Sequence, residues 1–245
     1  MPDPTLQAPT PSLLDGAALF LDFDGTLVEL ADAPGAIAVP ADLSPLLGRL
    51  AARLDGRLAL ISGRSIADLE RHLDCAGLAV SGSHGLELRL AGGAALPPTR
   101  PEGLDEARAA LARLAAEDSR LLVEDKPASV ALHFRAAPER ERELCDAAAA
   151  LAARTGLAVQ RGKMVAELRP PGADKGDALK ALMREPPFAG ARPLFVGDDL
   201  TDEHGFEAAA AFGGAGILVG PPRDTAARYR LAGVAEVAQW LRAAA

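Results

Sequence analysis

Phe20-Leu21-Asp22-Phe23-Asp24-Gly25-Thr26-Leu27 is the stretch of sequence that decides the fold. It continues an apolar run that begins at Ala17, and the run stops at two aspartates, a glycine and a threonine. A short, continuous apolar run is typical of a strand buried on both faces of a parallel sheet. Ligands of such sheets bind beyond the carboxyl ends of the strands. We therefore expect Asp22 and Asp24 to lie in a functional site, with Gly25 allowing a sharp turn.

Aspartate and glycine also end many strands as ordinary turn residues, so an isolated Asp-Gly pair would be weak evidence. Two carboxylates two positions apart at the end of a buried strand repel each other unless a cation offsets their charge. The pattern Asp-x-Asp-Gly-Thr after a fully apolar strand is more specific. It favours a functional site that holds a divalent cation.

The composition is that of a globular protein with aliphatic cores. The chain has 245 residues, of which 49% are hydrophobic and 4% aromatic, enough for one large domain or two smaller ones. Its net charge of −8 argues against nucleic acid as a partner, because a basic stripe is expected there. We find no long apolar span and no leader pattern, and we expect a cytoplasmic protein without membrane contact. A monomer is the simplest expectation.

Neither cysteine has the spacing of a metal ligand. Cys75 and Cys145 fall in helix-like segments, and buried thiols in a reducing compartment are the expected outcome. Residues 1–12 are rich in proline and are expected to form a flexible tail.

Strand-like and helix-like segments alternate through both ends of the chain. Short apolar strands are expected before Asp22 and at 58–61, 78–80, 193–196 and 215–219. Apolar residues at helical spacing predict helices at 43–54, at 66–73 and from 174 onward. This alternation predicts an α/β fold with a parallel, doubly wound sheet.

The middle of the chain has a different texture. Residues 91–101 are rich in glycine and proline, which is typical of a linker or hinge. Helices and short strands with faces of different polarity follow, expected at 104–114, 121–124, 129–135, 138–154, 157–160 and 163–169. We predict that residues 91–171 form a separate α+β module with an open sheet, inserted into a domain made of residues 1–90 and 172–245.

Four polar clusters follow the expected strands or open an expected helix. They are Asp22 with Asp24, then Ser62, then Lys175, and finally Asp198 with Asp199 and Asp202. Their shared place at the edge of a parallel sheet predicts a single site. Carboxylates suit a hard cation such as Mg²⁺, and the hydroxyl and ammonium can donate to an anion. This is the inventory of phosphoryl transfer, in which positioning and charge neutralisation supply most of the catalysis.

The chemistry of each group suggests its role. Asp22, nearest the strand end, can attack phosphorus and form an aspartyl-phosphate. Asp24 can protonate the leaving alcohol and then activate water. Ser62 and Lys175 can hold the non-bridging oxygens of the phosphate, the lysine as a compact point charge.

Metal binding is expected at the same place. Asp198 can complete the shell of a Mg²⁺ ion held with Asp22 and Asp24. Asp199 and Asp202 can bind the metal directly or orient its waters, and the second role is favoured for Asp202.

This order of motifs resembles that of the haloacid-dehalogenase-like phosphatases. That family has Asp-x-Asp-Gly-Thr, then Ser or Thr at a second strand end, then Lys, then Gly-Asp-Asp, and all four stand in this chain. The resemblance implies a Rossmann-like core, an aspartyl-phosphate intermediate and Mg²⁺. The inserted module looks like the larger α/β cap of that superfamily, and a cap selects the substrate by closing over it.

Further stretches are similar to those of the trehalose-6-phosphate phosphatases. They are Gly82–Glu87, Glu124–Lys126, His133–Arg135, Gly162–Glu167 and Gly197–Glu203. The similarity covers almost the whole chain and implies a phosphomonoesterase that converts trehalose 6-phosphate to trehalose and phosphate. By the same similarity, the sugar hydroxyls would be contacted by Glu124, Arg135, Lys163 and Glu167.

The remaining substrate-binding candidates stand beside these motifs. They are Gly25, Thr26, Gly63, Arg64, His84, Lys126 and His133. Alternation along the cap strands puts charged groups on one face, and such a face suits a polyol. The alternative is that these groups are solvated charges on an exposed sheet. Similarly, His84 could brace a loop between the domains, and Arg64 could pair with an acidic neighbour.

Other functions stay open on the sequence alone. The same chemistry could serve sucrose 6-phosphate or mannosyl-3-phosphoglycerate, and a mutase is a less favoured variant. From a different class, the chain could be a catalytically silent sugar-phosphate sensor. A binder has no need of both Asp22 and Asp24, so their presence favours an enzyme.

Overall fold

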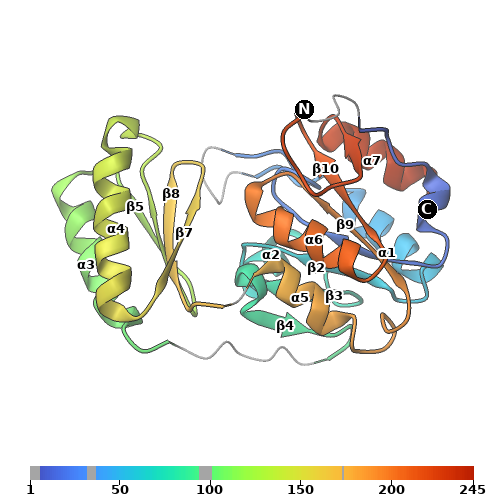
Figure 1. The fold of residues 1–245 in the computed structure, drawn as a ribbon, viewed down its shortest axis with the longest axis horizontal. Coiled ribbons are helices and arrows are strands. Elements are labelled where there is room, and N and C mark those ends of the chain that lie inside the picture. The colour runs from blue at the N-terminus through green and yellow to red at the C-terminus, as the bar shows by residue number, and fades with distance from the viewer. Residues whose placement is uncertain (1–5, 32–36, 94–100, 173) are drawn as a thin grey trace. The chain divides into compact units, whose positions relative to one another are not determined.

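A computed structural model describes residues 6–31, 37–93, 101–172 and 174–245 (Figure 1). They divide into two compact units. Residues 6–31, 37–93 and 174–245 form the core unit, and residues 101–172 form the cap unit. Within these ranges, every helix is too short or too polar to cross a membrane. The predicted α/β class, with a parallel core sheet and an inserted α+β module, is confirmed.

A seven-stranded sheet runs through the core unit in the order β11-β10-β9-β1-β2-β3-β4. All neighbouring pairs are parallel except β3 and β4, which are antiparallel. The strands are β1 (Ala17–Leu21), β2 (Leu58–Ile61), β3 (Ala79–Gly82), β4 (Glu87–Arg89), β9 (Arg192–Gly197), β10 (Ala215–Val219) and β11 (Tyr229–Leu231).

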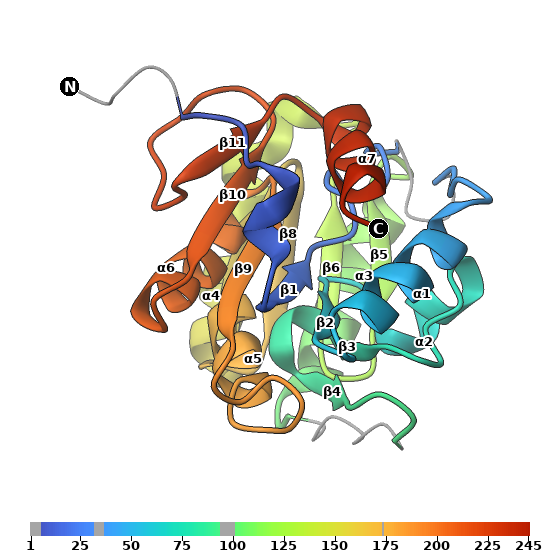
Figure 2. The ribbon, with the colours of Figure 1, turned by 90° about the vertical axis from the view of Figure 1, so that its right-hand side faces the viewer.

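Strand β1 is buried on both faces, as its apolar run predicts. Leu19 and Leu21 pack into one cluster with helices α1 and α7, whereas Ala18 and Phe20 pack into another with α5 and α6. Figure 2 shows these helices on the two sides of the sheet. The helices of this unit are α1 (Leu43–Arg53), α2 (Ile66–His72), α5 (Lys175–Leu182), α6 (Glu203–Ala211) and α7 (Val234–Ala243). The core unit is therefore a three-layer, Rossmann-like arrangement.

The strand order fixes where a site can form. β1 lies between β2 and β9, so the chain leaves β1 toward one side of the sheet and later returns on the other. Such a switch point leaves room at the carboxyl ends of the strands. Asp22, Ser62 and Asp198 directly follow β1, β2 and β9, and the fold thereby brings them to one edge.

The cap unit is a four-stranded antiparallel sheet in the order β5-β6-β8-β7. Its helices, α3 and α4, pack on one face of this sheet through a core that includes Leu111, Leu132 and Leu144 (Figure 1). The elements are α3 (Leu104–Glu117), β5 (Leu122–Asp125), β6 (Val130–His133), α4 (Glu141–Thr155), β7 (Ala158–Gly162) and β8 (Val165–Arg169).

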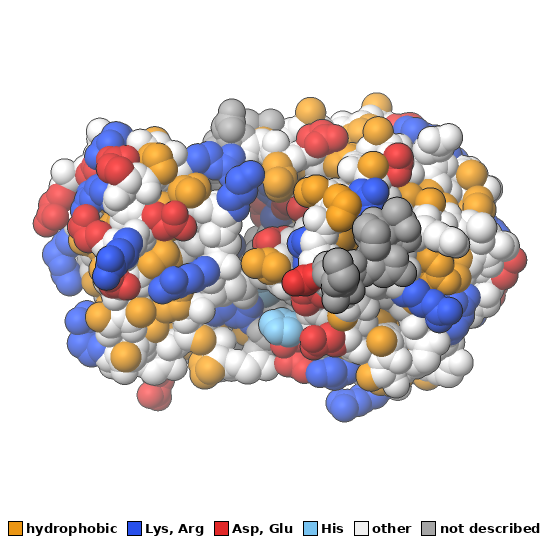
Figure 3. Space-filling model, turned by 45° about the horizontal axis from the view of Figure 1, so that its top comes forward, with side chains coloured by type: hydrophobic (Ala, Val, Ile, Leu, Met, Phe, Trp, Pro, Cys, Tyr) orange, Lys and Arg blue, Asp and Glu red, His pale blue; other side chains and the backbone are white. Residues whose placement is uncertain are grey.

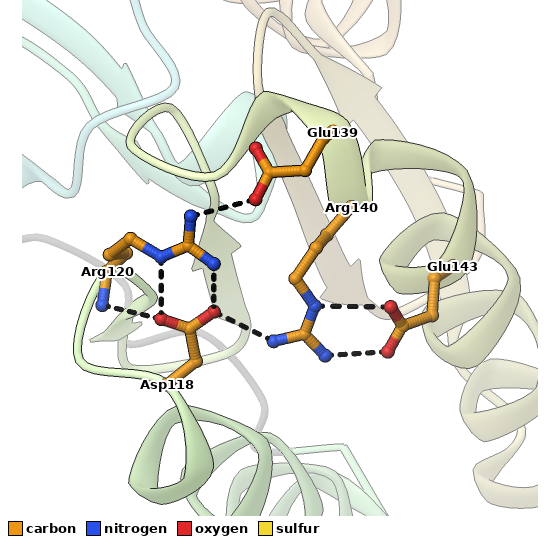
Figure 4. Close-up of polar contacts among 5 residues, drawn as sticks. All are labelled: Asp118, Arg120, Glu139, Arg140 and Glu143. Carbon is orange, nitrogen blue, oxygen red and sulfur yellow. Dashed lines mark hydrogen bonds and ion pairs between the residues drawn. The ribbon is translucent and has the colours of Figure 1, made fainter.

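An ion-pair network ties the end of α3 to the start of α4 (Figure 4). Asp118, just after α3, accepts hydrogen bonds from Arg120 at 2.8 Å and Arg140 at 3.0 Å. Arg120 also binds Glu139, and Arg140 binds Glu143. Hydrogen bonds from Arg120 hold the pKa of Asp118 well below its usual range. Asp118 and Arg140 are partly buried, whereas Arg120, Glu139 and Glu143 are exposed, and exposed pairs add little stability.

Charges of both signs are interspersed on the face in Figure 3, without a continuous basic stripe on that face. This distribution agrees with the negative net charge.

Several local features differ from the prediction. β4 and β11 are not predicted, because three residues are too few to display a period. Cys75 lies in a turn after α2 and not in a helix, although both cysteines are buried as expected. Residues 6–12 belong to the stretch expected as a flexible tail, yet Leu6 packs on the core and the carbonyl of Gln7 accepts from Arg230 N–H at 3.1 Å.

Two strands of the cap unit are shorter than predicted. β8 begins at Val165, so Lys163 lies in the tight turn between Gly162 and Val165 and not on the strand. β6 ends at His133, before Arg135. Met164 in that turn has a φ of 62°. Tight hairpin turns are recognised by Gly, Asn or Asp at such positions, and an apolar methionine gives no such signal.

Candidate active site

The site is assembled from the carboxyl ends of the three central strands and the start of one helix. Asp22, Ser62 and Asp198 come from the strands, and Lys175 is the first residue of α5. Asp174 caps this helix, because its side chain accepts from the backbone N–H of Asp177 at 2.8 Å. The four polar clusters predicted from the sequence therefore meet in the core unit.

Lys175 lies between two buried carboxylates. Its Nζ is 2.8 Å from Asp22 Oδ1 and 2.6 Å from Asp202 Oδ1. Burial alone would lower the pKa of Lys175, but the charges of Asp202 and Asp22 outweigh it and the pKa lies above its usual value. The lysine is thus a fixed cation at the foot of the site.

Three carboxylates come close enough to share one ion. An oxygen from each of Asp22, Asp198 and Asp202 lies within 4.8 Å of the others. Burial, with the charge of Asp202, raises the pKa of Asp198 to about 7. Burial also raises the pKa of Asp22 well above its usual value, although Lys175 opposes this. The carboxylates therefore repel one another, and two of them, Asp22 and Asp202, are buried.

The residues present fit a divalent cation. The Oδ1 atom of Asp198 is buried and has no hydrogen-bond partner among the described residues. An ion would supply that partner and offset the repulsion with Asp22. An all-oxygen donor set suits a hard ion.

Asp24 is held outside this group of three. Arg64 binds it through two contacts, Nε to Oδ2 at 2.7 Å and Nη2 to Oδ1 at 2.8 Å. Arg64 also binds Asp68 at 2.7 Å. The two-pronged pair holds both oxygens of the Asp24 carboxylate and orients it. Arg64 thus pairs with acidic neighbours, which is one of the two roles considered from the sequence.

Two glycines let the loops approach. Gly25 has a φ of +78°, and a Cβ there would lie 2.2 Å from Asp198 Oδ2. At Gly197, a Cβ would lie 2.3 Å from Asp202 Cγ. Any larger residue would push the carboxylates apart.

Hydrogen bonds to Asp202 and Asp199 hold the loop after β9 in place. Asp199 Oδ1 accepts from Leu200 N–H at 2.7 Å, and the N–H of Asp199 donates to Asp202 Oδ2 at 2.9 Å. Asp202 therefore divides its carboxylate between Lys175 and this backbone, while the Asp199 side chain lies outside the group of three.

The turn after β3 packs against the strand end that carries Ser62. The N–H of His84 donates to the carbonyl of Ser62 at 3.0 Å, and a Cβ on Gly63 would lie 2.6 Å from His84 Nε2. The hydroxyl of Ser62 accepts from Arg64 N–H at 3.1 Å. The hydroxyl of Thr26 is buried without a partner among the described residues. Ser62 and Thr26 can therefore still donate their hydroxyl protons.

Glu87 is a residue of this region that is not predicted as functional. It is buried, its Oε2 accepts from Ile66 N–H at 3.1 Å at the start of α2, and its Oε1 accepts from the Ser83 hydroxyl. It joins the turn after β3 to α2. The sequence feature that could have indicated a role for Glu87 is its place in the stretch Gly82–Glu87.

A second polar cluster lies on the cap sheet. Glu167 is buried and accepts from Ser129 Oγ at 2.5 Å and from Lys126 Nζ at 3.1 Å. His133 Nε2 and Glu124 Oε2 are 2.8 Å apart. Burial would raise the pKa of Glu124, but His133 and Lys126 outweigh it and the pKa lies below its usual value.

Other predicted cap residues lie at the end of the sheet. Arg135 and Lys163 are exposed and follow or precede the last paired residues, His133 and Val165. Residues that join the cluster without having been predicted are Ser129, Gln160 and Arg169, with Arg169 donating to Gln160 Oε1. The position of Arg169 on this face could be predicted, because it is two residues after Glu167 on the same strand. The position of Gln160 could not, because it depends on the pairing of β7 with β8.

Comparisons with known proteins agree on one family. The family model described as trehalose-phosphatase matches residues 20–235. A probable trehalose-phosphate phosphatase of Sinorhizobium fredii is 42% identical over 211 residues, 85% of this chain and 80% of that protein. The trehalose-6-phosphate phosphatase of Escherichia coli is 39% identical over 238 residues, 95% and 88% of the two chains. The C-terminal domain of the C. albicans trehalose-6-phosphate phosphatase has the same fold, with a TM-score of 0.82, 23% identity and coverage of 98% and 97%.

Proposed function

The chain belongs to the trehalose-phosphatase family, and we propose that it is a Mg²⁺-dependent phosphatase that hydrolyses trehalose 6-phosphate to trehalose and phosphate. The observation that carries the proposal is the buried group of Asp22, Lys175, Asp198 and Asp202 at the switch point of the core sheet. This group supports the proposal because it supplies a carboxylate that can attack phosphorus, a fixed cation and candidate metal ligands at one edge of the sheet.

In the proposed first step, an oxygen of Asp22 attacks phosphorus and the bond from phosphorus to the sugar oxygen breaks. Asp24 gives a proton to the departing oxygen. Water then attacks the phosphorus of the aspartyl-phosphate, Asp24 takes a proton from it, and Asp22 is released as a carboxylate. Because both oxygens of Asp24 accept from Arg64, their contact has to loosen when one of these oxygens carries the proton.

The phosphate oxygens need donors throughout. Lys175 opposes the rise in the pKa of Asp22 and can direct a further N–H to the phosphate. Ser62 and Thr26 can donate their hydroxyl protons, and the backbone at Gly25 and Gly63 leaves room for the phosphate. Asp22 and Asp198 would hold the Mg²⁺, with Asp202 orienting them through Lys175 and the loop backbone. A bound Mg²⁺ would neutralise charge on the carboxylates and the phosphate.

We propose that the cap cluster binds the sugar. Glu124, Arg135, Lys163 and Glu167 would contact the hydroxyls, while Lys126, His133 and Ser129 orient the two glutamates. These contacts support the proposal, because they fix the two glutamate carboxylates as acceptors that sugar hydroxyls can use. In the core unit, His84 would brace the Ser62 strand end.

Substrate choice is tested with a panel of phosphate esters in excess MgCl₂. We expect trehalose 6-phosphate to have a much higher kcat/KM than sucrose 6-phosphate, glucose 6-phosphate or p-nitrophenyl phosphate, because only the disaccharide can use every cap contact. Phosphate release is the measurement. Equal turnover across the panel would contradict the assigned substrate and leave a sugar phosphatase of unknown specificity.

The same panel tests the cap. E124Q is expected to lower kcat/KM for trehalose 6-phosphate relative to p-nitrophenyl phosphate by about tenfold, the effect of losing one or two hydrogen bonds to substrate. E117Q makes the same charge change on the exposed side of α3 and serves as the matched control. An unchanged ratio in E124Q would remove Glu124 from the substrate contacts.

Metal dependence is tested by chelation. Excess EDTA is expected to abolish phosphate release and MgCl₂ to restore it, because a phosphate dianion would otherwise meet three carboxylates whose charge is offset only in part by Lys175. Independently of turnover, MgCl₂ is expected to raise the midpoint of thermal unfolding, since the ion binds only the folded cluster. KCl at equal ionic strength is the control. Full turnover in EDTA would rule out the metal.

A further inference from the structure

An arginine from a distant loop holds the backbone of the loop that carries Asp198. Arg223 lies between β10 and β11, and its Nη2 donates to the carbonyl of Asp199 at 2.9 Å, with a longer contact to the carbonyl of Asp198 at 3.5 Å. Its side chain is largely buried, with 23% exposed. None of the motifs found in the sequence includes Arg223.

Glu203, the first residue of α6, fixes this arginine. One of its oxygens binds Arg223 Nη1, and the other accepts from the backbone N–H of Ala226 at 2.8 Å. The glutamate thus joins the β10–β11 loop to α6, and the guanidinium extends that connection to the Asp198–Asp199 backbone. Hydrogen bonds from an ionised donor are stronger than neutral ones, and the planar fork of arginine can hold two groups at once.

The same loop is also held from the interior. Asp202 Oδ2 accepts from the N–H of Asp199 at 2.9 Å, and Lys175 anchors the other oxygen of Asp202. Between these two restraints stands Asp198, whose buried Oδ1 has no partner among the described residues. The backbone on the carboxyl side of this candidate ligand is therefore fixed from both sides before an ion arrives.

We propose that Arg223, together with Glu203, is a positioning residue of the metal site, which holds the Asp198–Asp199 backbone so that the Asp198 carboxylate is presented beside Asp22. The proposal rests on the proposed function only in taking the ion to be Mg²⁺. A carboxylate that is already ordered binds a metal ion more tightly, because less conformational freedom is lost on binding. Mutation of the residues that hold metal-ligating side chains in place commonly lowers metal affinity by 10- to 100-fold.

The test is the dissociation constant of Mg²⁺, measured by isothermal titration calorimetry on the whole chain. R223Q is expected to bind Mg²⁺ about tenfold more weakly. R228Q removes the same charge from an exposed arginine of the same loop, one that contacts the ring of Tyr229, and is expected to bind like the wild type. R223K keeps the charge without the fork and should lie between the two.

Kinetics separate positioning from a general loss of structure. In R223Q, the MgCl₂ concentration for half-maximal rate should rise with the dissociation constant, while kcat at saturating MgCl₂ stays within about threefold of the wild type. A wild-type Mg²⁺ affinity in R223Q would overturn the proposal.

If circular dichroism shows that R223Q does not fold, E203Q, which leaves the arginine in place, is measured in the same way. Unchanged Mg²⁺ affinity in a folded E203Q would then overturn the proposal.

The proposed function and the positioning role of Arg223 can fail separately. A wild-type chain that binds Mg²⁺ but releases no phosphate from trehalose 6-phosphate would contradict the proposed function, and weaker binding by R223Q would still support the positioning role.

Discussion

Replacing Asp22 with Asn is expected to lower kcat for trehalose 6-phosphate by at least about a thousandfold, the scale seen when a nucleophile is removed. The amide has almost the same shape, so the loop after β1 should keep its place, but its nitrogen and oxygen cannot attack phosphorus as a carboxylate does. Lys175 would still be paired with Asp202. Phosphate release in excess MgCl₂ is the measurement.

The control for this variant is Asp15→Asn, which makes the same change at an exposed aspartate that forms an ion pair with Arg53. It should leave kcat unchanged. The midpoint of thermal unfolding of D22N shows whether the fold is kept. A D22N protein with more than a tenth of the wild-type rate would mean that another group attacks phosphorus.

Replacing Lys175 with Met is expected to have the largest effect on stability. Methionine fills a similar space, but it leaves the carboxylates of Asp22 and Asp202 buried without their cation. Breaking a buried pair in this way costs about 3–5 kcal/mol of unfolding free energy. Denaturant titration measures it, and phosphate release should be lost as well.

The pH dependence of K175M follows from the raised pKa of Asp22. A carboxyl with a raised pKa in the folded state destabilises the fold above its unfolded pKa, and the cost disappears as the pH falls and the group takes up a proton. Without the lysine this cost is larger, so the deficit of K175M should shrink between neutral pH and about pH 4.

Lys180→Met is the matched control, because Lys180 lies on the same helix, is half exposed and forms an ion pair with the similarly exposed Asp177. Its expected effect is within about 0.5 kcal/mol. If K175M and K180M were equally stable, the buried pairs would not stabilise the site as described.

The fold of the core follows from sequence because its strands are fully buried. A continuous apolar run such as Ala17–Leu21 has few alternatives, and the aspartates that end it mark the edge where the site forms. The gathering of Asp22, Ser62, Lys175 and Asp198 is a consequence of that strand order. It needs no information on individual contacts.

The partners of each side chain were harder to predict. Arg64 binds Asp24, and Arg223 binds the backbone after Asp198, but in both cases the partners stand on loops of different strands. Such contacts depend on how far each loop extends, and loop conformation leaves no periodic pattern in the sequence from which it could be predicted. The placement of Lys163 on a strand was wrong for a local reason, since Met164 adopts a left-handed turn conformation without a turn residue's signature.

The position of the cap within the chain has a consequence for synthesis. β1 is paired on one side with β9, and the whole cap unit lies between them in sequence. While the chain is being made, β1–β4 therefore leave the ribosome with one flank of the sheet still missing. The cap unit can complete its own sheet first, since all its strand pairs are internal. The catalytic edge closes only when β9 and β10 arrive, so truncated chains that end within the cap would expose the apolar edge of β1 to chaperones.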